Sequence, residues 1–405
     1  MKFNFFDPTP CGFPKPKVSL LPVLGRSSLV YTSSTGNSVF EFCGKDKRYY
    51  TRGRYALYAA YALAGVGPSG ALLAPAYHCR TMLDPAIRLG ANVVLYPVNR
   101  DLTPNIGALR NLLASKDIHI KAMLVTHYFG MPQQLVDLKR LCNEFSVSLI
   151  EDCAHSISVG GNANLVGNVG NYAVFSPYKF FPSGDGGLLI VNDSADELHE
   201  SKWPTKSPRI FAEAKWFVES IINYFRGPNR DIDINLMETD VSRLCAVPNS
   251  PPYETQCESY DLSRHYIKEQ ENCSGLILPR CLIKHTNITR LVQRRRENFQ
   301  FWIRVVSKLP HCRAVFQNLP EGVVPYMFPL YIDYPNPHFY FMKMLGVPIW
   351  RWDEMAVSDC PVASDYRTRL LHLPCHQELT SKEMEWMSIA ITNVIQKVPV
   401  DALWN

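Results

Sequence analysis

The chain has 405 residues, of which 46% are hydrophobic and 20% are charged, and its formal net charge at pH 7 is +5. This balance is typical of a soluble globular protein. The length exceeds what one compact core holds, so we expect a larger and a smaller domain that share a cleft. Because the basic residues are scattered and no apolar run approaches the roughly 18 residues that cross a membrane, we expect neither a nucleic-acid partner nor a membrane partner.

The cysteines and the N-terminus predict a cytoplasmic protein. Asp7 and two prolines stand where a signal peptide would need an apolar stretch. Twelve cysteines are spread from Cys11 to Cys375 without a CxxC pair. This spacing favours free thiols in a reducing compartment over disulfides, and it predicts no metal site.

The first half of the chain predicts an α/β fold. Residues 1–45 mix Pro, Ser, Thr and Gly with short apolar runs, which indicates an irregular N-terminal arm. Residues 46–200 alternate helical and strand-like blocks and are expected to form the large domain. We expect helices over 54–67, 106–115 and 133–145, and strands over 71–77, 91–98, 121–129, 147–155, 172–177 and 186–193. Such alternation indicates a mostly parallel sheet covered on both faces.

The second half changes character. Residues 201–260 are interpreted as a connecting region, with a helix over 215–225 and a loop over 248–254. Residues 261–405 are expected to form a smaller α+β C-terminal domain. Its predicted elements are a helix through Arg294, Arg295 and Arg296, a pair of strands over 323–334 and an amphipathic helix over 381–398. The arginine triplet is interpreted as an exposed, solvated helix face.

An acidic pair, Glu151 and Asp152, ends the apolar strand over 147–155. Ligands of open parallel sheets bind beyond the carboxyl ends of the strands, which is where this pair falls. A buried carboxylate there needs a cationic partner or hydrogen-bond donors. On these residues alone, a capping or solvated acid at a strand end remains the alternative.

A single lysine, Lys179, lies among aromatic and apolar neighbours between a strand and a glycine-rich turn. Such surroundings disfavour the charged ammonium form, as an amine nucleophile requires. By itself, a surface lysine whose stem packs on apolar residues is the alternative. The presence of Asp152 earlier in the chain favours the nucleophile.

Taken together, these segments resemble the DegT/DnrJ/EryC1/StrS sugar aminotransferases, which are pyridoxal-phosphate (PLP) enzymes of fold type I. The family's acidic-Asp-x-Ala-His block, glycine pair, Phe-Ser pair, lysine and Gly-Asp-Gly-Gly turn occur in the family's order, at residues 151–155, 166–171, 175–176, 179 and 184–187. The likeness is strong over about residues 50–190 and returns in the Leu-Pro-x-His segment at 373–376. It implies a fold type I enzyme with PLP as its cofactor.

The resemblance assigns catalytic roles to three residues. Lys179 would carry PLP as a Schiff base and, once released by the incoming amine, move the proton of the substrate carbon. Asp152 would pair with the pyridine nitrogen and keep it protonated. His155 would approach the phenolic oxygen of PLP or pack on its ring, and a purely structural histidine is the alternative.

The resemblance also implies a phosphate site at the start of a helix. Gly53, Arg54 and Tyr55 would offer backbone amides there, and Ser176 would be the second donor. The family usually has Gly-Thr at this point, so Arg54 keeps the amides and adds a cation. A helix start without a ligand is the alternative.

Three other features depart from the family or match it weakly. Cys79 occupies the position where the family stacks an aromatic ring on the cofactor, so Tyr77 or His78 would stack instead, or Cys79 would pack edgewise. The link between Ser176 and Lys179 is two residues shorter than in many members. Asn272 is the counterpart of the asparagine that a partner subunit contributes, so a homodimer is expected. The first two departures suggest an acceptor that need not be a nucleotide sugar.

The resemblance thus implies transfer of an amino group from an amino-acid donor, with glutamate expected, to a keto acceptor such as a keto sugar or its nucleotide-linked form. A PLP-dependent sugar dehydratase is one alternative, but those enzymes replace the family lysine with histidine. A PLP-binding protein that has lost turnover and acts as a sensor or interaction partner is another. The presence of Lys179, Asp152 and His155 favours the aminotransferase.

Overall fold

The structure is a computed structural model that describes residues 1–25, 46–157, 159, 166–192, 204–206, 210–226, 232, 250–259 and 261–401. Parts of the predicted N-terminal arm and of the predicted connecting region lie outside these ranges. None of the helices in the described part of the chain combines the length and the apolar character that crossing a bilayer requires.

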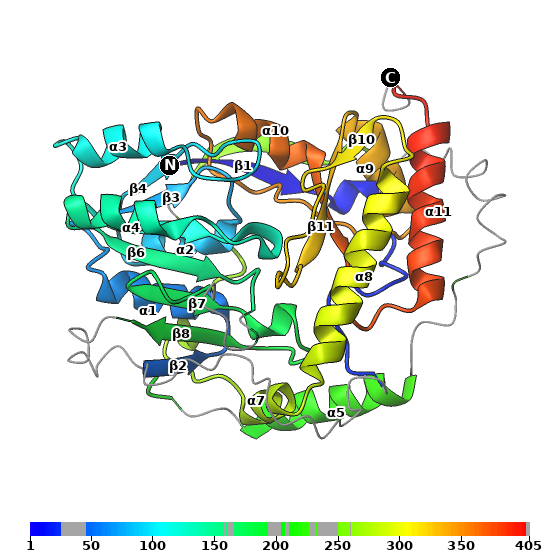
Figure 1. Cartoon of the computed structure of the whole chain (residues 1–405), viewed down its shortest axis with the longest axis horizontal. Coiled ribbons are helices and arrows are strands. Elements are labelled where there is room, and N and C mark those ends of the chain that lie inside the picture. The colour runs from blue at the N-terminus through cyan, green and yellow to red at the C-terminus, as the bar shows by residue number, and fades with distance from the viewer. Residues whose placement is uncertain are drawn as a thin grey trace.

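A seven-stranded sheet forms the centre of the N-terminal half (Figure 1). Its order is β2-β8-β7-β6-β5-β3-β4. The pairs β2–β8 and β8–β7 at one edge are antiparallel, and the other neighbours are parallel. The strands are β2 (Asp46–Tyr50), β3 (Ala71–Pro75), β4 (Val93–Tyr96), β5 (Ile120–Thr126), β6 (Ser148–Cys153), β7 (Tyr172–Phe175) and β8 (Gly187–Val191). The predicted α/β class with a mostly parallel sheet is therefore confirmed.

Helices cover both faces of this sheet, which is why its strands read as continuous apolar runs. They are α1 (Gly53–Leu63), α2 (Arg80–Arg88), α3 (Ile106–Ala114) and α4 (Leu135–Glu144). Leu72 of β3 joins the apolar core beneath α1 and α2, whereas the next residue, Leu73, joins the core beneath α3 and α4. The alternation of side chains along a strand thus divides one apolar run between two cores.

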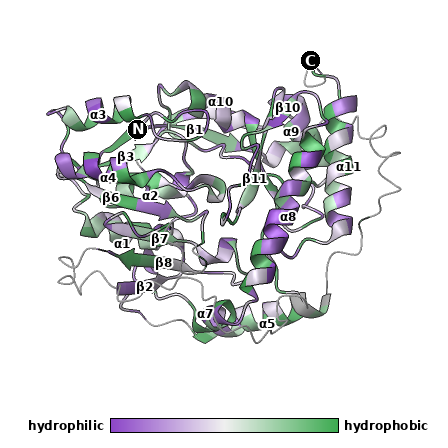
Figure 2. Cartoon of the chain, in the orientation of Figure 1, coloured by the Kyte–Doolittle hydropathy of each residue, from purple (hydrophilic) through white to green (hydrophobic). Residues whose placement is uncertain are grey.

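The C-terminal part builds its own core around a three-stranded antiparallel sheet. The strands are β10 (Cys312–Ala314), β11 (Met327–Ile332) and β12 (Leu370–Pro374), and the helices are α7 (Ile277–Lys284), α8 (Ile288–Val306), α9 (Pro335–Met344), α10 (Pro361–Arg369) and α11 (Ser381–Lys397). Hydrophilic and hydrophobic residues both occur along α8 and α11, as Figure 2 shows. The apolar ones, including Trp302 and Trp386, pack into the core of this part.

Two details of the C-terminal part and the N-terminal arm differ from the predictions. The strand pair expected over 323–334 is wrong, because β11 is one strand whose partners are the distant β10 and β12. The arm is not wholly irregular either: β1 (Lys2–Asp7) pairs antiparallel with β9 (Tyr253–Glu258), which takes part of the predicted loop over 248–254. Both pairings join segments that are far apart in the chain, which local patterns do not reveal.

The two halves of the chain are joined by a shared apolar core. Tyr326 and Trp352 of the C-terminal half belong to the same buried cluster as Tyr77 and Phe180 of the N-terminal half. The predicted helix over 215–225 is confirmed within α5 (Ile210–Arg226). The domain boundaries expected from the sequence stay a prediction.

Candidate active site

A pocket opens at the carboxyl ends of the parallel strands. Helix α1 contributes Gly53, Arg54 and Leu57, and the start of α2 contributes Cys79, Thr81 and Met82. The strands and the segments that follow them contribute Thr126, Asp152, Ala154, His155, Val174, Ser176, Tyr178 and Lys179, and the C-terminal half contributes Trp352. This is the edge of the sheet at which open α/β folds bind their ligands.

The structure brings seven of the predicted site residues together around this pocket, namely Gly53, Arg54, Cys79, Asp152, His155, Ser176 and Lys179. Tyr55, Tyr77 and His78 are buried outside its lining, and Asn272 is exposed. Because Asn272 was expected to act on the site of a partner subunit, its position in one chain leaves that role a prediction.

Glu151 and Asp152 are neighbours on β6 with opposite surroundings. Glu151 accepts the amides of Gly167, Val169 and Gly170 at 2.6–2.7 Å and the His127 ring at 3.1 Å. Burial opposes ionisation of Glu151, but these bonds outweigh it and the pKa of the carboxyl lies below its ordinary value. Glu151 therefore holds the segment that leads into β7, and its role is structural.

Asp152 points into the pocket instead. Its Oδ1 accepts the Ala154 amide at 2.9 Å. Burial raises the pKa of this carboxyl above its ordinary value, and the charge of Lys179 only partly opposes the shift. A buried carboxylate of this kind is stabilised by any cation that enters the pocket.

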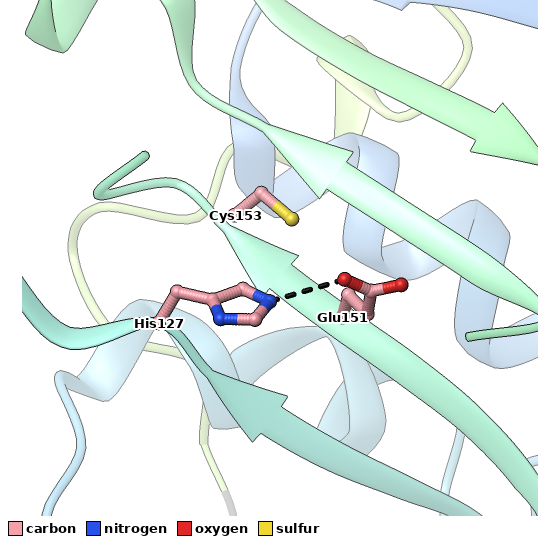
Figure 3. A group of neighbouring side chains, drawn as sticks. All are labelled: His127, Glu151 and Cys153. Carbon is pink, nitrogen blue, oxygen red and sulfur yellow. Dashed lines mark hydrogen bonds and ion pairs between the residues drawn. The ribbon is translucent and has the colours of Figure 1, made fainter. Parts of the chain in front are cut away.

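His127, Glu151 and Cys153 lie close enough to hold a metal ion, with ligand atoms within 4.8 Å of one another (Figure 3). Their hydrogen bonds argue against such a role. His127 Nδ1 accepts the Gln133 amide, so the ring proton lies on Nε2 and is donated to Glu151. Both oxygens of Glu151 also accept backbone amides. His127 and Glu151 therefore belong to a closed hydrogen-bond cluster.

Lys179 ends the short 3-10 helix η4 (Pro177–Lys179), whose first cap is Ser176. Its amide donates to the Ser176 carbonyl at 3.0 Å. Its Nζ lies 5.3 Å from the centroid of the Tyr326 ring, and that ring stacks on His155 at 4.4 Å. The amine thus faces an aromatic layer on one side and the Asp152 carboxylate across the pocket.

The start of α1 and Ser176 form the second end of the pocket. A Cβ atom on Gly53 would lie 2.2 Å from Ser176 Oγ, so only glycine allows this hydroxyl to approach the helix. The amide of Tyr55 donates to Arg52 O at 3.1 Å. The amides of Gly53 and Arg54 precede it at the positive end of the helix, which suits an anion.

Three residues, Tyr77, His78 and Cys79, were expected as candidates for stacking on a cofactor ring, and only Cys79 lines the pocket. Tyr77 contacts His372 Nε2 through its hydroxyl at 3.1 Å and packs against Trp352 at 4.7 Å. His78 accepts the Ala356 amide through Nε2. Of the three side chains, Cys79 lines the pocket, while the other two bind segments of the C-terminal half.

The Tyr55 side chain also contacts residues outside the pocket lining. Its hydroxyl accepts the amide of Ile267 at 3.1 Å, and its ring packs edgewise on Tyr266 at 5.4 Å. Because a helix turns by 100° per residue, the side chain at the third position of α1 leaves the pocket even though its neighbours line it. Its backbone amide is used by Arg52 O.

The C-terminal half supplies residues that the sequence did not reveal. Trp352 lines the pocket but lies in no recognisable motif. We expected the arginine triplet to lie on an exposed helix face. This expectation is wrong for Arg295, which is fully buried. A signal existed: Leu291, Arg295, Phe299 and Trp302 fall on the buried stripe of α8 at helical spacing.

An open α/β sheet that gathers a lysine, a buried aspartate and a helix start around one pocket has the architecture of the PLP-dependent aminotransferases of fold type I. The relationship is also visible in the sequence. Residues 42–202 match the model of the DegT/DnrJ/EryC1/StrS aminotransferase family, as the motifs predict.

Two individual relatives share low sequence identity with part of the chain. The chain is 26% identical to GDP-perosamine synthase of Vibrio cholerae over 44% of its own length and 48% of that protein. It is 30% identical to the pleiotropic regulatory protein of Geobacillus stearothermophilus over 36% of its length and 40% of that protein. The matches thus span about half or less of each of these relatives.

The solved structure of PseC from Helicobacter pylori, described as an aminotransferase of pseudoaminic acid biosynthesis, shares the fold. The TM-score is 0.60 over 95% of this chain and 99% of PseC, at 13% identity. The likeness extends to the C-terminal half, which the family match over residues 42–202 does not reach.

Proposed function

We propose that this protein is a PLP-dependent aminotransferase that moves an amino group from an amino-acid donor to a keto acceptor. Glutamate is the proposed donor, and a keto sugar, free or nucleotide-linked, is the proposed acceptor. The observation that carries the proposal is the meeting of Lys179, Asp152 and the Gly53–Ser176 contact on one pocket.

The pocket fits the three functional ends of PLP. The α1 start and the Ser176 hydroxyl suit a phosphate, and the Arg54 side chain adds a positive charge at the same end. Asp152, whose pKa is raised by burial, suits a protonated ring nitrogen. Lys179 offers the amine for an aldehyde. When bound, PLP supplies an electron sink for the carbon whose proton is removed.

Lys179 is proposed to hold the cofactor covalently and, once displaced by the donor amine, to carry the proton to and from the substrate carbon. The Tyr326 ring lies beside this amine, and Trp352 lines the same pocket. In the first half reaction the donor amino group would pass to the cofactor, and water would supply the oxygen of the keto-acid product. In the second the amino group would pass to the acceptor, whose keto oxygen would leave as water, so the two half reactions balance.

His155 is proposed to donate a hydrogen bond to the phenolic oxygen of PLP. Burial, followed by the charge of Lys179 and the proximity of His372, lowers the pKa of His155 well below its ordinary value. The ring is therefore neutral at pH 7. Its Nδ1 accepts the Phe129 amide at 3.3 Å, so the proton lies on Nε2 and is available for donation.

Absorbance tests the proposal directly. The purified protein with PLP should absorb in the visible range, and Lys179→Ala should abolish that band. Glutamate should convert the band, and a keto-sugar acceptor should restore it. If neither glutamate nor any other amine donor changes the absorbance, the protein binds PLP without transfer and the proposal fails.

We also propose a homodimer in which Asn272 reaches the site of the partner subunit. Light scattering on the purified protein gives the mass of the assembly. A monomer at micromolar concentration with full activity would contradict this part of the proposal.

A further inference from the structure

We infer that Arg295 is a positioning residue for Lys179. It acts through the backbone carbonyls of Lys179 and Phe180, which are called the lysine segment below. The inference rests on the proposed role of Lys179 as the cofactor-binding amine. It concerns a residue that lies outside the pocket lining and in the other half of the chain.

The Arg295 guanidinium binds the last residue of η4 and the residue that follows it. Its Nη2 donates to the carbonyl oxygens of Lys179 at 3.1 Å and Phe180 at 3.3 Å. Its Nη1 donates to those of Pro325 and Tyr326, both at 3.1 Å. One planar group therefore ties the lysine segment to the segment that carries the Tyr326 ring.

Gln377 completes the arrangement. Its Oε1 accepts Arg295 Nε at 2.8 Å, and its Nε2 donates to the Phe180 carbonyl at 2.8 Å. Arginine and glutamine thus hold the same carbonyl from two directions and hold each other in place. Three segments that are distant in the chain meet at this one side chain.

Burying the Arg295 guanidinium costs free energy, which indicates that the positions of the carbonyls it binds are important for the protein. The side chain is fully buried. Burial lowers the pKa of its guanidinium to about 10, and the charge of Glu378 opposes this shift only in part. The hydrogen bonds of this cation go to neutral oxygens, and the Phe180 ring lies 4.5 Å away, so its burial is expensive where an apolar residue would fill the space.

The lysine segment needs such support because its own structure is short. The 3-10 helix η4 is only three residues long, and helices of this kind have weak hydrogen bonds. Lys179 Nζ lies at the end of a flexible four-carbon stem, so the position of its Cα decides where the amine can reach. Fixing the Lys179 and Phe180 carbonyls therefore limits the positions of Nζ.

The neighbouring Arg296 offers a matched control. It lies on the same helix and also donates to two backbone carbonyls, those of Pro320 at 2.8 Å and Val323 at 2.7 Å. Neither of these residues belongs to the lysine segment. Arg296→Met removes an arginine and its carbonyl bonds without touching Lys179.

The experiment compares bound with attached cofactor. Each variant is incubated with PLP, total bound PLP is measured after alkaline release, and the fraction on Lys179 is measured by peptide mass after borohydride reduction. Arg295→Met should keep PLP binding at the phosphate end but lower the ratio of attached to bound PLP about tenfold, because small misplacements of a reacting group are costly. The ratio in Arg295→Lys should lie between those of Arg295→Met and the wild type, and Arg296→Met should keep the wild-type ratio.

A wild-type ratio in Arg295→Met, measured below its melting temperature, would overturn the inference, since a purely structural arginine would lower stability alone. If Arg295→Met does not fold, Arg295→Lys and Gln377→Leu replace it, and wild-type ratios in both would overturn the inference equally. If the wild-type protein itself places no PLP on Lys179, the proposed function fails and this inference fails with it.

Discussion

The two sides of the pocket are built on different principles. The sheet side presents ionisable groups at the ends of strands, with Asp152 and Lys179 as the main examples. The C-terminal side, represented by Arg295, Tyr326 and Trp352, supplies aromatic rings and a buried cation that binds backbone. The difference teaches that the groups proposed to react come from the sheet, while their positions depend on the other half of the chain.

A second contrast lies within β6. Glu151 has a lowered pKa and four hydrogen-bond donors, whereas its neighbour Asp152 has a raised pKa and one backbone donor. Successive strand residues face opposite ways, so one carboxylate closes a structural cluster and the other faces the pocket. Substitutions at these two positions should separate stability from activity.

The largest effect is expected at Asp152. Asp152→Asn keeps the shape but removes the charge that would pair with the ring nitrogen, so transfer activity should fall about 10²- to 10³-fold. Its unfolding free energy at pH 7 should not fall, because burial disfavours the charged form. Kinetics and urea unfolding measure the two quantities, and activity within tenfold of wild type would remove Asp152 from the reaction.

Glu151→Gln should show the reverse pattern. The amide nitrogen of glutamine would face backbone donors in the closed cluster, so we expect a loss of about 3 kcal/mol in unfolding free energy. Glu144→Gln, at an exposed ion pair with Arg110, is the control and should cost less than about 1 kcal/mol. Equal losses in urea unfolding would show that Glu151 is no anchor.

Gly53→Ala tests the contact between α1 and Ser176. The added Cβ meets Ser176 Oγ, so the variant should lose about 1–3 kcal/mol of unfolding free energy. Removing that oxygen in Gly53→Ala with Ser176→Ala should recover most of the loss. Gly107→Ala at the start of α3, where the nearest atom lies at 3.6 Å, is the control. No recovery in the double variant would contradict the close approach.

The smallest effect at neutral pH concerns His372 on the C-terminal side. Burial, and next the charge of Lys179, lower the pKa of this histidine to about 3 from its ordinary 6.5. Between these values the unfolded chain takes up a proton that the folded protein does not, so stability falls as the pH falls. His372→Gln should reduce the slope of unfolding free energy against pH by about 1.4 kcal/mol per unit between pH 6 and 4.

Above pH 7.5 the two slopes should coincide, because His372 is then neutral in both the folded and the unfolded states. Urea unfolding at half-unit pH steps gives the two curves. Parallel curves down to pH 4 would show that His372 takes up its proton in the folded protein as well.

Much of the sheet side could be predicted because its signals are local. The strand over 147–155, the lysine between apolar neighbours and the turn at Gly184–Gly187 each occupy a short stretch of sequence. Their order along the chain was sufficient to identify the family that residues 42–202 match. Periodicity likewise gave the α/β class, since strands buried on both faces read as apolar runs.

The sequence by itself therefore determined the fold class, the family that residues 42–202 match, and the candidate lysine and aspartate. Only the tertiary structure decided that Arg295 is buried behind Lys179, that Trp352 lines the pocket, and that Tyr77 turns away from it. The physical reason is that these positions result from packing between segments hundreds of residues apart. A local pattern records which side chains are apolar or charged, but the partners that bury them are chosen when the two halves of the chain meet.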